Sequence, residues 1–213
     1  MKKKLVIFDL DGTLLNTASN LRFCVNEALK KHNKRQISIS QTIAYVGNGA
    51  KKLVERATAD ESLTESVYKD FTPILQSNPT YLIKPYPHIK KLLKKLKSEG
   101  VKIAVFSNKP HEATVAICNE FFATYAFDYV LGHKNGAPLK PDASGVFEIL
   151  NALNVAKEDC IFVGDGETDA QTSINAGIDF IGVLWGFRSE QTLRNYGATC
   201  FASAPQEILN QLF

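Results

Sequence analysis

The sequence predicts an α/β fold that is built on a parallel sheet and carries a helical insertion near its N-terminus. Short apolar runs typical of strands alternate with amphipathic helical patterns along most of the 213 residues. This alternation is typical of a parallel sheet with helices on both faces. Residues 16–83 break it, because they show helical patterns without a convincing strand. Polar residues follow several of the predicted strands.

Buried strands are predicted where a short apolar run is rich in β-branched or aromatic residues. Four segments meet this description: Leu5–Phe8, Val101–Phe106, Cys160–Val163 and Phe180–Leu184. Asp128–Leu131 is a weaker fifth strand. Because helical patterns separate these runs, we expect the strands to lie parallel in one sheet.

Two helices are predicted between the strands from apolar residues that recur at helical spacing. One has the apolar positions Ile89, Leu92, Leu93 and Leu96, with lysines on its other face. Gly100 follows as its expected C-terminal cap. The second helix has the apolar positions Val146, Phe147, Leu150 and Leu153.

The helical segment is bracketed by turn residues, namely Asn16-Thr17 before it and Asn78-Pro79 and Pro85-Tyr86-Pro87 after it. Its clearest apolar positions are Leu21, Val25, Ala28, Leu29, Leu53, Val54 and Ala57. We predict a core of residues 1–15 and 84–213 with residues 16–83 as a separate helical insert. The alternative is that these helices pack directly on the sheet.

Composition restricts the class of partner. The net charge of +3 is weak, and the lysine groups are not interleaved with aromatic residues, so we expect solvated faces and no nucleic-acid partner.

No run approaches the roughly 20 apolar residues of a membrane span, and the N-terminal apolar run is too short for a signal peptide. The four cysteines lie far apart, so we expect reduced thiols in the cytoplasm. Oligomeric state does not follow from the sequence.

Three predicted strands end in polar clusters that should meet in one crevice. The first strand is followed by Asp9 and Asp11, the second long strand by Ser107-Asn108-Lys109, and a later strand by residues 164–169. Open parallel sheets bind ligands beyond the carboxyl ends of their strands. Each cluster alone could be an ordinary turn or helix cap, but their shared position favours a functional site.

The acidic residues in these clusters predict a metal site. Four carboxylates would crowd together, namely Asp9, Asp11, Asp165 and Asp169. Their mutual repulsion requires a cation, and all-oxygen ligands suit Mg²⁺, which keeps waters for a substrate phosphate. Ser107 offers a hydroxyl donor, and Lys140 offers a balancing positive charge. Without the other groups, Lys140 would be taken for a surface lysine.

These residues resemble the four motifs of the haloacid dehalogenase superfamily, in the right order. The matching segments are Asp9-Leu10-Asp11-Gly12-Thr13, Ser107-Asn108, Lys140-Pro141, and Gly164-Asp165 with Asp169. The resemblance implies a Rossmann-like core with a helical cap inserted after the first strand. It also implies a magnesium-dependent phosphatase that acts on a small phosphorylated metabolite through an aspartyl-phosphate.

The resemblance also implies a role for each matching residue. Asp9 is the nucleophile, and Asp11 is the general acid and then the general base. The phosphoryl group is held by Ser107, Asn108 and Lys140. The metal is held by Asp9, Asp165 and the main-chain carbonyl of Asp11, with Asp169 in support. Dehalogenases of the superfamily lack an aspartate at the position of Asp11, so its presence favours a phosphatase or a phosphomutase.

Two further stretches resemble the phosphoglycolate phosphatase group. One spans residues 45–50, and the other spans residues 182–187 with 196–198. In the first, Gly47, Asn48, Gly49 and Lys51 are candidates for substrate specificity, because main-chain N–H groups at a helix start can face a small anion. The alternative is that the glycines only make a turn. Glu167 after Gly166 is a less usual residue for the metal loop and could alter metal preference or substrate range.

The preferred substrate from this resemblance is 2-phosphoglycolate. The alternatives are a sugar phosphate, a nucleotide monophosphate or pyrophosphate as substrate, a phosphomutase, or a binding protein that kept the fold without turnover. The last is disfavoured because Asp9, Asp11 and the metal acids are all present.

Overall fold

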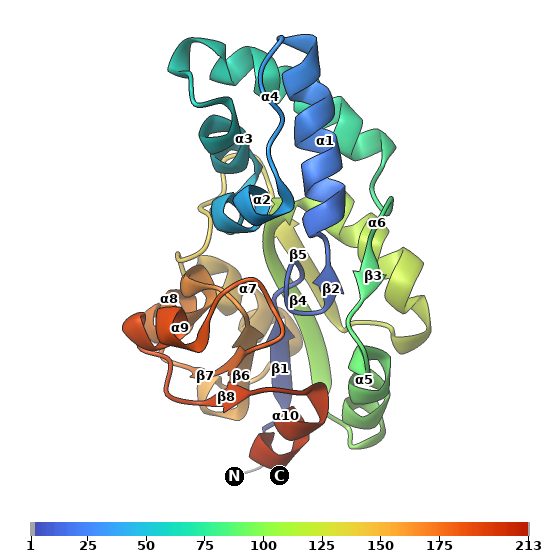
Figure 1. The fold of residues 1–213 in the computed structure, drawn as a ribbon. Helices are drawn as coiled ribbons and strands as arrows, with labels where there is room; N and C mark the ends of the chain where they lie inside the picture. Colours follow the sequence, from blue (N-terminus) through green and yellow to red (C-terminus); the bar gives the residue numbers. More distant parts are fainter. Residues whose placement is uncertain (1–2, 213) are drawn as a thin grey trace.

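A computed structural model describes residues 3–212 of the chain. Its centre is a six-stranded sheet in the order β5-β4-β1-β6-β7-β8 (Figure 1), in which every neighbouring pair is parallel. The strands are β1 (Leu5–Phe8), β4 (Lys102–Pro110), β5 (Tyr129–His133), β6 (Cys160–Gly164), β7 (Asp179–Val183) and β8 (Phe201–Ala202). The predicted α/β fold with a parallel sheet is therefore confirmed.

Helices cover both faces of the sheet. Successive side chains of a strand point to opposite faces, and here both faces carry apolar residues that the helices bury. In β1, Val6 and Phe8 join the core under one layer of helices, while Leu5 and Ile7 join the core under the other. The first layer holds α5 (Ile89–Ser98), α6 (His111–Phe122) and α10 (Pro205–Leu212). The second holds α7 (Ser144–Leu153) and α8 (Glu167–Ala176). The remaining helical segments of this part are η1 (Ala123–Tyr125), η2 (Lys157–Asp159) and α9 (Glu190–Asn195).

All five predicted strands are present in the six-stranded sheet, and two differences from the prediction matter. β4 continues to Pro110, past the predicted end at Phe106, and its pairing with β5 is irregular between these two residues. Polar residues thus stay on an extended path that the apolar pattern could not indicate. β8 was not predicted, because two residues are too few to give a recognisable pattern.

The two predicted helices of this part are present as α5 and α7. All four apolar positions of α5 are buried, and Gly100 has the left-handed φ of 73° that favours glycine after a helix. In α7 the prediction for Phe147 was wrong, since this side chain is 43% exposed. The buried stripe runs instead through Val146, Ile149 and Leu150, at the spacing i, i+3, i+4.

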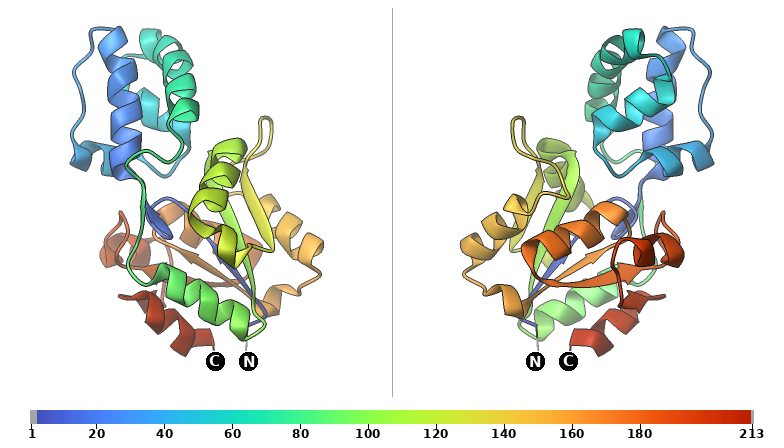
Figure 2. Two further views of the ribbon diagram at one scale, coloured as in Figure 1. Left: turned by 90° about the vertical axis from the view of Figure 1, so that its right-hand side faces the viewer. Right: turned by 90° about the vertical axis from the view of Figure 1, so that its left-hand side faces the viewer.

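Four further helices form a bundle at one end of the molecule (Figures 1 and 2). They are α1 (Ala18–Lys31), α2 (Ile39–Tyr45), α3 (Ala50–Thr58) and α4 (Glu61–Ser77). They enclose a hydrophobic cluster of their own, which includes Leu29, Leu53 and Phe71 and is distinct from the clusters on the sheet. The assignment of residues 16–83 as a separate domain stays a prediction.

A short antiparallel ribbon joins the bundle to the rest of the chain. It consists of β2 (Leu15–Asn16) and β3 (Lys84–Pro85), with Leu15 opposite Pro85. Because both connecting segments run side by side, the bundle is attached at one edge (Figure 2). Its other edge lies over the carboxyl ends of the sheet strands, where bundle and sheet residues line one cavity.

The four cysteines are free. Cys24, Cys118 and Cys160 are buried, and Cys200 is partly exposed. Burial raises the pKa of Cys118 and of Cys160 to about 12. None of the helices within residues 3–212 has the length and apolar character needed to cross a membrane.

Candidate active site

Three neighbouring strands bring the predicted site residues to one edge of the sheet. β1 lies between β4 and β6. Asp9 follows β1, Ser107 and Asn108 lie in the last part of β4, and Asp165 follows β6. This is the carboxyl edge, where parallel sheets bind their ligands. The clusters that the sequence places after separate strands are therefore brought together.

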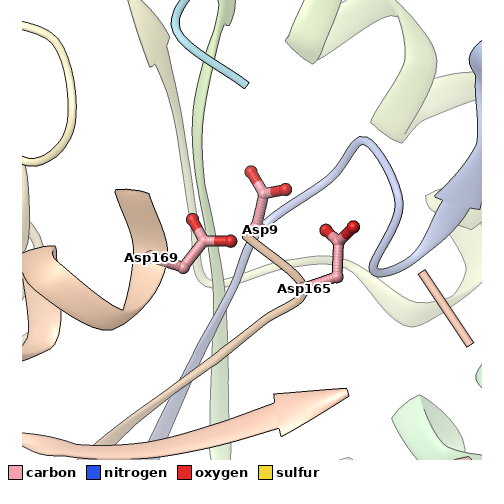
Figure 3. A group of neighbouring side chains, drawn as sticks. All are labelled: Asp9, Asp165 and Asp169. Atoms are coloured by element: carbon pink, nitrogen blue, oxygen red, sulfur yellow. The ribbon is translucent and has the colours of Figure 1, made fainter. Parts of the chain in front are cut away.

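An acidic cluster lies at the centre of this edge. Asp9, Asp165 and Asp169 each place one carboxylate oxygen within 4.8 Å of the others. Figure 3 shows the three side chains reaching the same space from the ends of β1 and β6 and from the first turn of α8. All three residues are buried. Asp169, which the resemblance placed in a supporting role, thus has a carboxylate oxygen within 4.8 Å of those of the other two.

Asp165 is held in place from two sides. The Thr13 hydroxyl donates to its Oδ1 at 3.0 Å, and the Phe187 amide donates to its Oδ2 at 2.7 Å. Gly12 passes so close that a Cβ on it would lie 2.3 Å from Oδ2, and its φ of +95° also favours glycine. The glycine between Asp11 and Thr13 therefore gives Asp165 its space.

The burial of these acids has a large electrostatic consequence. Burial raises the pKa of Asp9 well above its ordinary value, against the opposing charge of Lys140. Burial, and then the charge of Asp169, raise the pKa of Asp165 to about 7. Crowded buried carboxylates are stabilised in the ionised form by a cation. The all-oxygen set fits a hard divalent ion such as Mg²⁺, which prefers carboxylate ligands.

Lys140 supplies one positive charge to the acidic cluster. Its Nζ lies 2.7 Å from Asp9 Oδ1 and 2.6 Å from Asp169 Oδ1. It also lies 5.6 Å from the ring centre of Phe106 and 5.4 Å from that of Phe162, within cation–π range. Burial alone would lower the pKa of Lys140, but Asp169 and Asp9 together raise it. Lys140 is therefore a buried, charged lysine and not a surface residue.

Asn108 is engaged with the protein backbone. Its Oδ1 accepts from the Lys140 amide at 2.7 Å, and its Nδ2 donates to the carbonyls of Lys140 and Gly47, each at 3.1 Å. The side chain thus fixes the backbone that carries Lys140 and contacts the bundle. Ser107 is buried beside it, and its Oγ accepts from the Lys109 amide at 3.3 Å.

Asp11 lies outside the acidic cluster and faces a second lysine. Lys109 Nζ is 3.3 Å from Asp11 Oδ1, and the Lys109 side chain is only 2% exposed. The carboxylates of Asp9 and Asp11 therefore have different neighbours, although they are two residues apart. Sequence reasoning gave Lys109 no role, because a lysine after Ser107-Asn108 has no meaning until its partner is known.

A cavity of about 60 Å³ separates the bundle from the sheet edge. The bundle contributes an apolar wall that includes Leu21, Leu53 and Leu75. The sheet side contributes the acids and three cations, namely Lys109, Lys140 and Arg188. Arg188 was not singled out from the sequence either, because its place depends on contacts between distant segments.

Two of the four candidate specificity residues lie at the cavity, and two do not. Gly47 and Gly49 line the cavity. Lys51 forms an ion pair with Glu65, and the two side chains are 59% and 72% exposed. Asn48 and Lys51 are not among the cavity-lining residues. A role for Lys51 in anion binding at this cavity is thus not favoured by its position.

Comparisons with known proteins agree with this geometry. Residues 6–183 match the family model described as haloacid dehalogenase-like hydrolase. A relative named phosphoglycolate phosphatase from Colwellia psychrerythraea is 30% identical over 94% of this chain and 93% of its own length. Another of that name from Aquifex aeolicus is 31% identical over 86% of each chain. A solved structure from Lactobacillus delbrueckii subsp. bulgaricus, assigned provisionally as a phosphoglycolate phosphatase, has a TM-score of 0.94 at 30% identity and covers 100% of this chain and 99% of its own.

Proposed function

Because this chain belongs to the haloacid dehalogenase-like hydrolases, we propose that it is a magnesium-dependent phosphatase that hydrolyses small phosphate monoesters, with 2-phosphoglycolate as its substrate. The observation that carries the proposal is the buried group of Asp9, Asp165 and Asp169 with Lys140 among them. The names of the relatives from Colwellia psychrerythraea and Aquifex aeolicus support the choice of substrate.

The first chemical step is an attack by Asp9. A carboxylate oxygen of Asp9 forms a bond to phosphorus while the bond from phosphorus to the ester oxygen breaks, which leaves an aspartyl-phosphate and an alkoxide. Such transfers depend mainly on positioning and on charge stabilisation. Lys140 and Ser107 would hold the phosphoryl oxygens, and the hydrogen bonds of Asn108 to the backbone of Lys140 support this role.

Asp11 handles the proton in both halves of the reaction. It donates a proton to the departing alkoxide, and it then takes a proton from the water that attacks phosphorus and releases Asp9. One group can serve both steps because it gives up its proton in the first step and regains a proton in the second. Its position outside the acidic cluster suits this role, since Asp11 does not share the crowding of the three buried acids.

A divalent cation fits the site on the chemistry of its donors. Asp9, Asp165 and the main-chain carbonyl of Asp11 would hold it, with Asp169 beside them. When bound, the cation supplies positive charge that offsets the phosphate and the carboxylates. The crowding of the three buried carboxylates supports this requirement, because Lys140 alone brings one charge against three.

We propose that the helical bundle of residues 16–83 acts as a cap that closes over the substrate. Its apolar wall would exclude bulk water from the cavity and so strengthen the electrostatic interactions there. The cavity lies between this apolar wall and the acidic edge of the sheet, so a substrate bound there would contact both parts.

The cations of the cavity favour a substrate with a second negative group. Lys109 and Arg188 line the cavity in addition to Lys140, and the substrate carboxylate of phosphoglycolate would complement this charge. Among these, Lys109 is the better candidate for direct contact, because the Arg188 guanidinium already donates to three protein groups.

Matched esters and matched lysine variants test this function. We expect Mg²⁺-dependent phosphate release from 2-phosphoglycolate, and much slower release from 2-hydroxyethyl phosphate, which lacks the carboxylate. Lys109→Met should reduce the preference for phosphoglycolate by about tenfold, the value of one charge-assisted hydrogen bond. Lys51→Met is the control and should leave the preference unchanged. Equal turnover of the two esters by the native protein would contradict the proposed substrate.

A further inference from the structure

Arg188 joins the sheet part of the molecule to the helical bundle. It lies in the segment after β7, and its guanidinium donates to two backbone carbonyls of the bundle. Nη1 lies 2.7 Å from the Ile43 carbonyl oxygen, and Nη2 lies 2.6 Å from the Val46 carbonyl oxygen. Both carbonyls belong to the C-terminal end of α2. A side chain of the sheet part thus binds the segment that leads directly into Gly47 and Gly49 at the cavity.

The end of α2 needs such donors. The last carbonyls of a helix have no partner within it, and they form the negative end of the helix dipole. Arg56 of α3 donates to the Tyr45 carbonyl at 2.7 Å from within the bundle. Arg188 likewise donates hydrogen bonds to the carbonyls of Ile43 and Val46, but from outside the bundle. The chain therefore contains two arginines with similar partners, of which only Arg188 crosses between the two parts.

Glu167 orients Arg188. Its Oε2 accepts from Arg188 Nε at 2.8 Å. The Arg188 side chain is 13% exposed and the Glu167 side chain is 20% exposed. Such a partly buried, charge-assisted bond restricts the guanidinium to one direction. Glu167 is the first residue of α8, the helix that also carries Asp169. Glu167, the less usual residue of the predicted metal loop, therefore lies outside the acidic cluster of Asp9, Asp165 and Asp169. It binds Arg188 instead.

We propose that Arg188, oriented by Glu167, is a positioning residue that holds residues 46–49 of the cap over the active site. Asn108 adds a second tie, since its Nδ2 donates to the Gly47 carbonyl at 3.1 Å. The Glu167–Arg188 pair links the first turn of α8, beside the catalytic acids, to the cavity-facing loop of the cap. Its effect on turnover rests on the proposed phosphatase function, whereas its effect on cap position does not.

The position of the cap can be measured without turnover. Nitroxide labels are attached to Lys52→Cys on α3 and Gln191→Cys on α9, both exposed positions, in a Cys200→Ser background in which the remaining cysteines are buried. Pulsed electron resonance then gives the distance distribution between the labels. We expect Arg188→Gln to shift it to longer distances, and Glu167→Gln to shift it in the same direction. Arg56→Gln is the matched control and should keep the distribution of the parent.

An unchanged distribution in folded Arg188→Gln protein would overturn the proposal. An equal shift in Arg56→Gln would also overturn it, because the effect would then come from a weaker α2 and not from the link. If Arg188→Gln does not fold, Glu167→Gln decides the test, and an unchanged distance distribution in that variant would overturn the proposal.

A kinetic measurement distinguishes a failure of the proposed role of Arg188 from a failure of the proposed phosphatase function. With phosphoglycolate, Arg188→Gln should lower kcat/KM by about tenfold or more, since both charge-assisted bonds from Arg188 to the cap are lost. Arg188→Lys should recover only part, because a lysine cannot reach both carbonyls and Glu167 at once. If the parent protein does not hydrolyse phosphoglycolate, the proposed substrate is wrong, while the label distances still decide the role of Arg188.

Discussion

Asp9 and Asp11 show how two like residues obtain different chemistry from their neighbours. Asp9 is buried against Asp165, Asp169 and Lys140, and burial raises its pKa. Asp11 faces Lys109 at 3.3 Å, at the border of the cavity. Asp9 and Asp11 line the same cavity, so both carboxylates can reach one substrate. These different surroundings suit the proposed division of the pair into a nucleophile and a proton carrier.

The role of Asp11 predicts a separation of the two half-reactions. Asp11→Asn cannot protonate an alkoxide, so turnover of phosphoglycolate should fall by about a hundredfold or more, the usual contribution of a general acid. With p-nitrophenyl phosphate the leaving group needs no proton, and one equivalent of nitrophenol should appear in a rapid burst before turnover slows. Stopped-flow absorbance measures the burst. Full turnover of phosphoglycolate by Asp11→Asn would show that Asp11 is not the acid.

The thiols give a second prediction at this scale. Burial raises the pKa of Cys24 to about 11 and that of Cys118 and Cys160 to about 12. Their reactive thiolate forms are therefore scarce below these pH values. At pH 8, a thiol reagent should modify Cys200 alone in the native protein and all four cysteines after denaturation. Mass spectrometry of digested protein identifies the modified residue, and rapid native modification of Cys118 would contradict the buried core on this face of the sheet.

At the scale of the elements, loops after neighbouring strands approach each other closely around the proposed metal site. The segment after β7 passes Asp165 at Gly186, where a Cβ would lie 2.2 Å from the Asp165 Cβ. The next residue, Phe187, donates its amide to the same aspartate at 2.7 Å. β7 neighbours β6 in the sheet, so the order of the strands decides which loop supports which acid.

Gly186→Ala should therefore disturb the metal site. The added methyl group displaces Asp165, and loss of an aligned ligand typically weakens metal binding by about 10–100-fold. The thermal stabilisation of the protein by Mg²⁺ should shift to higher Mg²⁺ concentrations. Gly100→Ala controls for backbone strain alone, because a Cβ there meets nothing within 4 Å but the φ of 73° still favours glycine. It should lower thermal stability without changing the Mg²⁺ dependence. An unchanged Mg²⁺ dependence in Gly186→Ala would argue against Asp165 as a ligand.

The elements also show what could be predicted from the sequence. Strands such as Leu5–Phe8 are recognisable because a buried parallel strand is a continuous apolar run. β2, β3 and β8 have two residues each, and no pattern can form over that length. The acids were found because they lie directly after strands. Arg188 and Lys109 were not, because their meaning depends on Glu167, Asp11 and the end of α2, which only the folded chain brings near.

At the scale of the whole molecule, the bundle and the sheet have separate hydrophobic cores. The bundle core includes Phe71, which is 1% exposed. The two parts meet at the ribbon of β2 and β3, at the cavity and at the Arg188 contacts. Few apolar contacts cross between two such parts, so each can respond separately to destabilisation.

Phe71→Ala tests this separation. Removal of a buried phenylalanine typically costs about 3–5 kcal/mol, and here the cost should fall on the bundle. We expect the loss of phosphoglycolate turnover together with retention of Mg²⁺-dependent stabilisation of the sheet part, which calorimetry in the presence and absence of Mg²⁺ resolves. A single cooperative loss of both properties would mean that the bundle and the sheet fold as one unit.

The most direct test of the central claim is phosphate release from 2-phosphoglycolate, measured against sugar phosphates, nucleotide monophosphates and pyrophosphate with and without Mg²⁺. The native protein should prefer phosphoglycolate and require Mg²⁺, and Asp9→Asn should abolish release. Retained Mg²⁺-dependent release in Asp9→Asn, or no Mg²⁺-dependent release of phosphate from any of these compounds by the native protein, would contradict an aspartyl-phosphate mechanism at this site.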